Sequence, residues 1–268
     1  MKNYGSLADN ILKKISFSPD IAVVMGSGLA NISSYLEGPK SISYESLPGY
    51  PQTTIHGHSG KFVFGKIGHV KVLLAIGRFH YYEGYSLEEV TAPIKLFSKL
   101  KIKDLIITNS AGSMNEDFPP GSFLISNGHM DCTFLKNSNE PQMVSDAKYH
   151  NPKLIKIAMA CSKKLKLKTN FGIYCWTMGP AYETPAEIKN MQQLGGDAVG
   201  MSTVPEIIEA GDRGMRVLTM SCLTNFAAGI SQTKLTHEEV VSNAKKFDND
   251  FSKLLERIIK NIYKINIR

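Results

Sequence analysis

The sequence predicts a single α/β domain in which helices flank a central, mixed and largely parallel sheet. Short apolar runs alternate with segments of helical periodicity along the chain, which is the pattern of successive βα units. Several of these apolar runs end directly in small or polar residues, as strands do where an α/β sheet binds ligands. No linker, repeat or low-complexity segment divides the 268 residues, so one domain over residues 1–268 is expected.

Strands are expected where apolar residues run continuously for about four to eight positions. The first such run ends in GSGL, and the second and third form a pair that turns at Gly68. Later runs end in the segments TNSAG, MGPAYETPAE and CLTNFAAG. In chain order, the expected strands cover residues 20–25, 61–67, 70–76, 104–108, 123–126, 171–177, 197–200 and 215–221.

Helices are expected where apolar residues recur every three or four positions. Leu87, Val90, Ile94 and Phe97 show this spacing. Three expected helices have both bounds defined, at residues 7–15, 87–100 and 152–165. Four more have one bound defined: one ends at residue 36, one ends at 194, one begins near 205, and the last runs from 238 onward. Residues 41–52, rich in Pro, Gly and Tyr, and the polar residues 137–145 are expected to be irregular.

Charge and composition exclude several classes of protein. The formal net charge of +7 comes mostly from lysines scattered without interleaved aromatic residues, so a solvated surface is expected and nucleic acid is not an expected partner. No apolar run approaches transmembrane length and the N-terminus lacks an apolar signal segment, which predicts a cytoplasmic protein without a membrane partner. The four cysteines lie far apart without a CxxC pair, as reduced thiols do, and no metal centre is expected.

Residues 77–85, GRFHYYEGY, follow an expected strand and form a candidate anion site. Arg78 and His80 are two positions apart, so on an extended backbone both side chains point the same way. They would converge on one anion, with Tyr82 continuing that face, while Glu83 could hold either the Arg or the His in place. The alternative is a polar strand end held by a surface ion pair.

Two further motifs in the N-terminal part suit an anion. The segment Gly26-Ser27-Gly28 follows a strand, so its backbone N–H groups and the Ser27 hydroxyl could cradle a phosphate, although a plain tight turn has the same sequence. Asn31 stands where the dinucleotide fingerprint needs its third glycine, which argues against a Rossmann-type oxidoreductase. His56 and His58 have too few companion ligands for a metal site, so loop histidines near an anion are expected.

Other strand ends carry groups that suit a flat, polar ligand. Small residues in TNSAG, residues 108–112, allow close approach to the backbone. Ser202 could cap a helix or reach a phosphate oxygen, and Met201 could support a sugar or belong to the core. Tyr182 and Glu183 could stack on a purine and read its edge. Asn225 can donate and accept at a base edge, although a surface loop would also explain such residues.

Taken together, these motifs resemble the trimeric purine nucleoside phosphorylases. The resemblance runs in the same order from about residue 21 to residue 240, and GRFHYYEGY and AVGMSTVPE are its most specific parts. The matching segments are GSG at 26–28, GHSG at 57–60, GRFHYYEGY at 77–85, TNSAG at 108–112, GPAYET at 179–184, AVGMSTVPE at 198–206, LTN at 223–225 and HEEV at 237–240.

The resemblance implies the nucleoside phosphorylase fold and phosphorolysis of purine nucleosides to a free base and a pentose 1-phosphate, with inorganic phosphate as co-substrate and no other cofactor. It implies a catalytic set of Asn225, Glu183 and His80. Phosphate would be held by Ser27, Arg78, His80, the backbone at Ser110, and Ser202, with His58 nearby. The ribose would contact Tyr82, Met201 and His237. The base would contact Ala111, Gly112, Tyr182, Glu183, Val199, Gly200, Thr224 and Asn225.

Two features bear on specificity and assembly. The resemblance implies that methylthioadenosine phosphorylases have an aspartate at the position of Asn225. An amide at this position, with Glu183 at the purine N1, favours inosine and guanosine as substrates. Two alternatives remain: a phosphorylase of adenosine or methylthioadenosine, and a relative that binds nucleosides without activity. Hydrolysis of nucleosides without phosphate is disfavoured, because no aspartate cluster that could hold a metal-bound water lies near the N-terminus. The resemblance also implies a homotrimer in which an aromatic side chain reaches a neighbour's ribose site. Between Met130 and Asp146 the chain is shorter than in the family, and Phe134 is the only aromatic before Tyr149.

Overall fold

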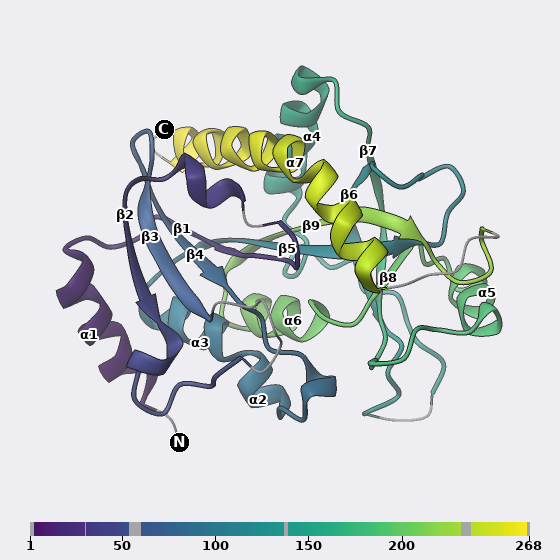
Figure 1. Cartoon of the computed structure of the whole chain (residues 1–268), viewed down its shortest axis with the longest axis horizontal. Helices are drawn as coiled ribbons and strands as arrows, with labels where there is room; N and C mark the ends of the chain where they lie inside the picture. Colours follow the sequence, from purple (N-terminus) through teal and green to yellow (C-terminus); the bar gives the residue numbers. More distant parts are fainter. Residues whose placement is uncertain (1–2, 30, 54–59, 137–138, 232–236, 267–268) are drawn as a thin grey trace.

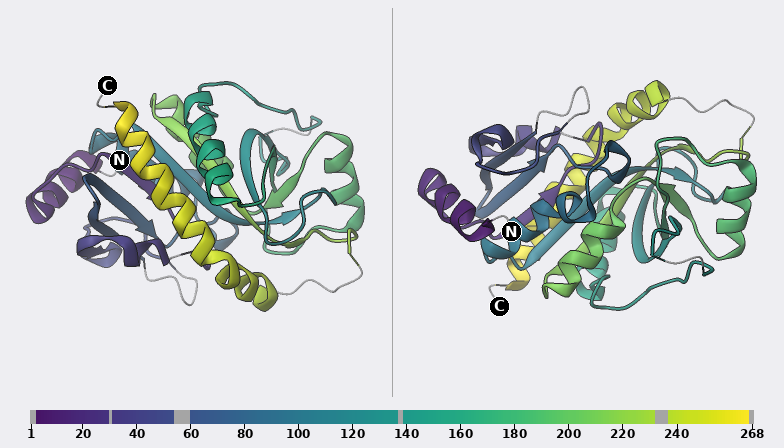
Figure 2. Two further views of the ribbon diagram at one scale, coloured as in Figure 1. Left: turned by 90° about the horizontal axis from the view of Figure 1, so that it is seen from above. Right: turned by 90° about the horizontal axis from the view of Figure 1, so that it is seen from below.

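A computed structural model describes residues 3–29, 31–53, 60–136, 139–231 and 237–266 of the chain, with side chains at 240–264 of the last segment. A twisted sheet lies between two helical layers (Figure 1). On one face, α4 (Pro152–Leu165) and α7 (His237–Asn266) pack on the sheet, and α7 runs diagonally across it (Figure 2). The other face carries α1 (Tyr4–Ile15), α3 (Ala92–Lys99) and α6 (Val204–Asp212). Each helix buries one apolar stripe against the strands.

Nine described strands form one mixed sheet in the order β2-β3-β4-β1-β5-β8-β7-β6-β9. Five of the described pairings are parallel (β1–β4, β1–β5, β5–β9, β6–β7 and β7–β8), which agrees with the expected mixed, largely parallel sheet. Their bounds are β1 Ile21–Val24, β2 Glu37–Ser43, β3 Lys61–Ile67, β4 Val70–Ile76, β5 Asp104–Ser113, β6 Phe123–Asp131, β7 Thr169–Trp176, β8 Ala198–Gly200 and β9 Arg216–Phe226.

The pairing of β5 with β9 gives one half of the sheet a closed form. Because β5 also pairs with β8, the strands β5, β8, β7, β6 and β9 follow one another in a ring. Within it, Ala111 of β5 lies opposite Leu223 of β9, and Gly112 lies opposite Asn225. This register places the TNSAG and LTN segments side by side at one end of the sheet.

Three strands extend beyond the apolar runs that predict them. β5 continues to Ser113, β6 to Asp131 and β9 to Phe226. Backbone hydrogen bonding to neighbouring strands keeps these polar ends extended, which apolar periodicity does not report. β2 was not expected from the sequence. Its segment EGPKSIS has no continuous apolar run and contains Pro39, and its first five residues are exposed. It lies at the sheet edge and pairs only with β3 among the described strands.

Two expected helices take a different form. The segment expected to be one helix over 87–100 breaks at Thr91 into α2 (Leu87–Val90) and α3, because Pro93 lacks the N–H that a continuous helix needs at that position. In the run that ends at residue 36, the described residues form a short 3₁₀ helix, Asn31–Tyr35, in place of the expected α-helix. There the Ser34 hydroxyl donates to the Asn31 carbonyl at 2.7 Å, and such local bonds compete with an α-helix.

The remaining elements follow the expected pattern. Strands β3 and β4 and helix α4 have the expected bounds, and α5 (Pro185–Gln193), α6 and α7 occupy the expected segments. Three cysteines are buried and Cys132 is half-buried, and none forms a disulfide. No described helix is both long and apolar enough to span a lipid bilayer. His56 and His58 lie outside the described residues.

Candidate active site

One cavity is lined by residues at or just beyond the ends of β1, β4, β5, β8 and β9, in the loop between β7 and α5, and on α7. Every residue predicted for the site whose side chain is described lines this cavity. His58 lies outside the described residues, and the His237 side chain is likewise not described, although α7 begins there. The lining residues are Ser27, Arg78, His80, Tyr82, Asn109, Ser110, Ala111, Gly112, Tyr182, Glu183, Val199, Gly200, Met201, Ser202, Thr224, Asn225, Ala227 and Val240.

Arg78 is held in the cavity wall by a buried carboxylate. Its Nε lies 3.2 Å from Oε1 and 3.0 Å from Oε2 of Glu206, in the first turn of α6. Burial raises the pKa of Glu206, and the charge of Arg78 opposes that rise. Arg78 Nη2 is buried without a hydrogen-bond partner among the described residues. Glu206 therefore fixes one edge of the guanidinium and leaves another edge with a donor to offer an anion.

Sequence reasoning missed Glu206 as the partner of Arg78. A signal was present, because the carboxylate stands in an apolar segment between Val204, Pro205 and Ile207, all buried. A glutamate in such a segment is seldom fully buried unless it is paired with a cation. The identity of that cation is not readable from the local sequence.

His80 is oriented by Glu83 in the turn that follows β4. Glu83 Oε1 accepts the backbone N–H of His80 at 2.8 Å and lies 2.7 Å from His80 Nδ1. A carboxylate at Nδ1 makes that nitrogen the hydrogen-bond donor. Of the two partners considered for Glu83, the structure therefore gives it the histidine. The His80 ring stacks on Tyr82 with centroids 4.8 Å apart, and burial is the main cause that raises the pKa of Tyr82 to about 12.

The glycine turn after β1 is fixed against the end of β5. The Gly26 N–H donates to Thr108 Oγ1 at 2.9 Å, and that hydroxyl donates to the Val24 carbonyl at 3.0 Å. Ser110 Oγ donates to the Ser27 carbonyl at 2.8 Å. A Cβ at position 26 would lie 2.6 Å from the Asn109 Cα, so only glycine allows this approach. The Ser110 hydroxyl thus supports the turn, and its backbone remains the part predicted to face phosphate.

The segment that precedes α6 brings further hydroxyl groups to the same end of the cavity. Thr203, with φ of +80°, occupies the N-cap position of α6 without a side-chain capping bond. Ser202 therefore does not take the capping role considered for it, and its hydroxyl lies 3.0 Å from Thr203 Oγ1. Asn109 Nδ2 donates to Thr203 Oγ1 at 3.0 Å. Asn109 and Thr203 were not singled out from the sequence, although both lie inside matched motifs.

At the other end of the cavity, the amide of Asn225 is fixed by two hydrogen bonds. Thr224 Oγ1 donates to Asn225 Oδ1 at 2.7 Å, and Asn225 Nδ2 donates to the Phe226 carbonyl at 2.8 Å. An amide NH₂ group carries two hydrogens, so one remains to be donated to a ligand. A Cβ on Gly112 would lie 3.2 Å from Asn225 Nδ2. The small residue at 112 thus keeps the space in front of this amide.

Glu183 supplies an acceptor in the same part of the cavity. It stands in the loop between β7 and α5, and its Oε1 accepts a hydrogen bond from Thr177 Oγ1. Thr177 was not predicted as a site residue, and it lies behind the wall of the cavity, in a second hollow that also contacts Glu183. Among the described residues, no group of three or more His, Cys, Asp or Glu side chains could hold a metal ion.

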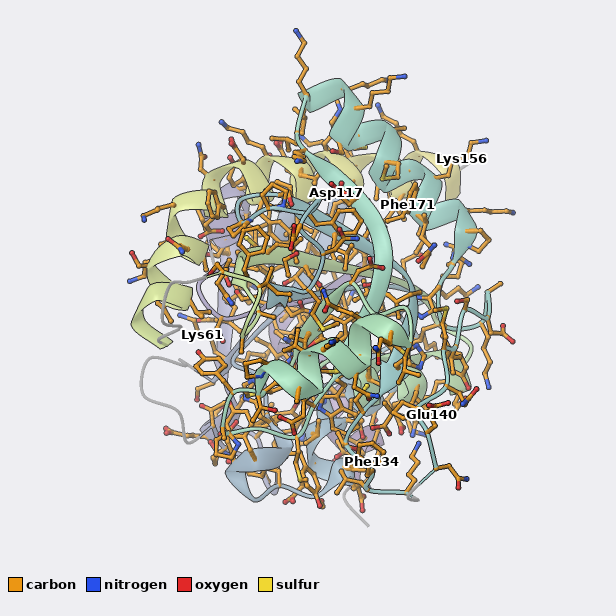
Figure 3. All side chains as sticks on the ribbon, turned by 90° about the vertical axis from the view of Figure 1, so that its right-hand side faces the viewer. Lys61, Asp117, Phe134, Glu140, Lys156 and Phe171 are labelled. Carbon is orange, nitrogen blue, oxygen red and sulfur yellow. The ribbon has the colours of Figure 1, made fainter. Side chains whose placement is uncertain are left out.

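Phe134 does not contribute to the cavity of its own subunit among the described residues. It lies in the connection between β6 and α4 with φ of +57° and is 56% exposed. Figure 3 shows it at the edge of the molecule, in the same part of the view as Glu140. It also borders the second hollow, which Tyr182 and Glu183 share.

Comparisons with known proteins agree along nearly the whole chain. Residues 20–260 match the model of the Phosphorylase superfamily. The chain is 39% identical to purine nucleoside phosphorylase 1 of Geobacillus stearothermophilus over 96% of both chains, and 31% identical to purine nucleoside phosphorylase of Mus musculus over 97% of this chain and 95% of that protein. Schistosoma mansoni purine nucleoside phosphorylase in complex with inosine superposes with a TM-score of 0.87 at 32% identity, covering 96% of this chain and 95% of the other.

Proposed function

The chain belongs to the purine nucleoside phosphorylases of the Phosphorylase superfamily, and from this premise we propose that it acts on 6-oxopurine nucleosides. It is an enzyme that cleaves the glycosidic bond of purine nucleosides with inorganic phosphate. The proposed substrates are inosine, guanosine and their deoxy forms, and the products are the free base and (deoxy)ribose 1-phosphate for purine salvage. The supporting observation is the pair of groups at the base end of the cavity, the Glu183 acceptor and the Asn225 donor.

Phosphate occupies the end of the cavity where donors converge. Arg78, with its buried Nη2, and His80, held by Glu83, would bind its oxygens together with Ser27, Ser202 and the backbone at Ser110. The N-terminus of α6 adds the positive end of the helix dipole. His58 is proposed to complete the site. A charge-assisted clamp of this kind is what binding an inorganic anion requires.

The ribose lies between the two ends of the cavity. Tyr82 and Met201 line that middle part, and Val240 at the start of α7 lies beside it. We place His237 near the 5′-hydroxyl, because it begins the same helix three residues before Val240. This arrangement holds the C1′ carbon between the phosphate oxygens and the purine N9.

The reaction is a displacement at C1′. The C1′–N9 bond breaks and its electron pair stays on the purine, while a phosphate oxygen forms the new bond to C1′. Positive charge grows on the sugar, as in other oxocarbenium-like transition states, and the phosphate dianion stabilises it. Negative charge grows in the purine, and the N–H of Asn225 at N7 and O6 stabilises it. Positioning and preorganised charge carry the catalysis, so the enzyme needs no covalent nucleophile.

Base specificity follows from hydrogen-bond polarity. In hypoxanthine and guanine, N1 carries a hydrogen that Glu183 can accept, and O6 can accept from Asn225. Adenine has an N1 without hydrogen and a 6-amino donor. Glu183 would then face another acceptor and the Asn225 N–H another donor, and a site with such mismatched polar groups discriminates strongly against the ligand. The structure of a Schistosoma mansoni relative contains adenosine. Binding of adenosine is therefore a separate property from its cleavage, and both need to be measured.

The test is a phosphate-dependence assay on inosine, guanosine and adenosine side by side. We expect phosphate to be required for release of hypoxanthine and guanine, with adenosine cleaved far more slowly. Equal rates with and without phosphate would refute phosphorolysis by this chain. Faster cleavage of adenosine or methylthioadenosine would favour the alternative specificity, and tight binding without turnover would indicate a relative that only binds nucleosides.

We also propose a cytoplasmic homotrimer in which Phe134 closes the ribose site of a neighbouring subunit. The exposed ring and its position beside the second hollow support this arrangement.

A further inference from the structure

We propose that Thr177 is a positioning residue for the base, acting through Glu183. Its hydroxyl holds one carboxylate oxygen of Glu183, which leaves the other oxygen aimed at the purine N1–H. The inference rests on the proposed role of Glu183 and adds a residue that none of the matched motifs includes.

The backbone of Thr177 is anchored before its side chain acts. It follows the last residue of β7, and its N–H donates to the Gly200 carbonyl at 3.0 Å. Gly200 ends β8 and lines the reaction cavity. Thr177 therefore has a fixed position relative to the cavity wall, while its own side chain faces the second hollow.

The loop that carries Glu183 is fixed at its far end as well. Thr184 caps α5, with Glu187 Oε2 accepting the Thr184 N–H at 2.7 Å and the Thr184 hydroxyl at 2.8 Å. Glu187 is thereby occupied and does not compete for the base. Both ends of the loop are held by backbone or capping bonds, and neither bond orients the Glu183 side chain.

Within the described part of the chain, the Thr177 hydroxyl is the one hydrogen-bond partner of the Glu183 carboxylate. Glu183 is half-buried, so without this bond its carboxylate would sample several rotamers and bind water. A glutamate loses substantial rotamer freedom when it is fixed, and a partner that fixes it beforehand removes that cost from substrate binding. The hydroxyl thus sets the acceptor in place before the purine arrives.

The hydrogen bond also assigns the two oxygens. With Oε1 engaged by Thr177, Oε2 is the atom available to the N1–H of a 6-oxopurine. The effect of Thr177 should therefore exist only for bases with a hydrogen on N1, and only while Glu183 is present.

The test combines Thr177→Val, which removes the hydroxyl at nearly constant volume, with Thr177→Ser, which keeps it. Thr133→Val is the matched control, because Thr133 borders the same hollow but its hydroxyl donates to Asp131 Oδ1 at 2.6 Å. We expect Thr177→Val to lower kcat/KM for inosine by about three- to tenfold, the value of one hydrogen bond. The loss should appear mainly in KM, while Thr177→Ser and Thr133→Val stay close to wild type.

Two further measurements separate positioning from a general structural role. Thr177→Val should not lower the kcat/KM for adenosine, whose N1 has no hydrogen. It should add no further loss for inosine when combined with Glu183→Ala. An equal loss for adenosine and inosine, or a full additional loss in the double variant, overturns the inference.

The same set of variants tests the proposed function separately. If Glu183→Ala retains wild-type kcat/KM for inosine, the base-binding role of Glu183 is wrong. If Glu183→Ala lowers kcat/KM but Thr177→Val leaves it unchanged, the proposed role of Glu183 stands and the role of Thr177 is rejected.

Discussion

Arg78 and Glu206 form a buried ion pair in the wall of the cavity, although 128 residues separate them in the chain. The arginine follows β4 and the glutamate lies in the first turn of α6, so the pair joins the end of a strand to the start of a helix. A buried pair of this kind contributes little net stability compared with apolar packing, but loss of one partner is costly. Its value here is that it fixes the orientation of the guanidinium.

Removal of the Glu206 charge should therefore affect stability and phosphate binding together. We expect Glu206→Gln to lower the free energy of unfolding by about 3–5 kcal/mol, because the Arg78 charge remains buried without its partner. Phosphate should restore part of the loss, since the anion supplies a new counter-charge and binds only the folded state. Urea unfolding with and without phosphate measures both effects.

Glu209→Gln is the matched control for this prediction. Glu209 lies on the same helix and pairs with Arg213 at 2.6 Å, but both side chains are partly exposed. Its loss should change the free energy of unfolding by less than about 1 kcal/mol. Equal destabilisation in the two variants would contradict the role assigned to the buried pair.

Substitution of Asn225 tests the base end of the cavity. Asn225→Ala should raise the barrier for inosine by about 2.7–4 kcal/mol if its N–H stabilises the departing purine as an oxyanion-hole donor does. Asn225→Asp should shift preference toward adenosine, because a carboxylate accepts from the 6-amino group. The measurement is kcat/KM for both nucleosides, and an unchanged ratio in the aspartate variant would reject the assignment.

Acid should destabilise the protein through a buried histidine pair. His129 Nδ1 lies 2.8 Å from His150 Nε2, with both rings nearly inaccessible. Burial, together with the neighbouring His150 and Lys136, lowers the pKa of His129 to about 3, and burial lowers the pKa of His150 to about 4 against an opposing bond at Ser126. Both rings are neutral in the folded state at neutral pH.

The sign of the pH dependence follows from these shifts. The unfolded chain takes up protons below about pH 6.5 and the folded chain does not, so stability is full above that pH and falls as the pH drops toward 4. Each histidine should remove about 1.4 kcal/mol per pH unit in this window. Urea midpoints at pH 7 and pH 5 measure the loss. His129→Gln should lessen the slope, whereas substitution of the exposed His69 should leave it unchanged.

Replacement of Phe134 tests the shared site. If its ring closes a neighbour's ribose site, Phe134→Ala should raise the nucleoside KM about tenfold or more, as loss of an interface hot spot does. Phe171→Ala is the control, since Phe171 is 44% exposed and lies at the start of β7, well away from Phe134 (Figure 3). Light scattering on both variants reports the oligomeric state. A monomeric wild type with full activity would contradict the trimer.

Much of the fold was readable from local patterns. The strand pair β3–β4 and helix α4 have the expected bounds, because a continuous apolar run or a helical period decides such elements within a few residues. The edge strand β2 and the polar ends of β5, β6 and β9 were not readable. Their extended form depends on hydrogen bonds to strands that come from distant parts of the chain.

The sequence by itself determined which residues meet in the cavity. Motifs that follow successive strands come to the same end of an α/β sheet, so Arg78, Ser202 and Asn225 were predictable as neighbours from their places in the chain. Only the tertiary structure decided how each is held. Glu206 pairs with Arg78, and the Thr177 hydroxyl donates to Glu183. Packing and burial select these partners, and the local sequence does not identify them.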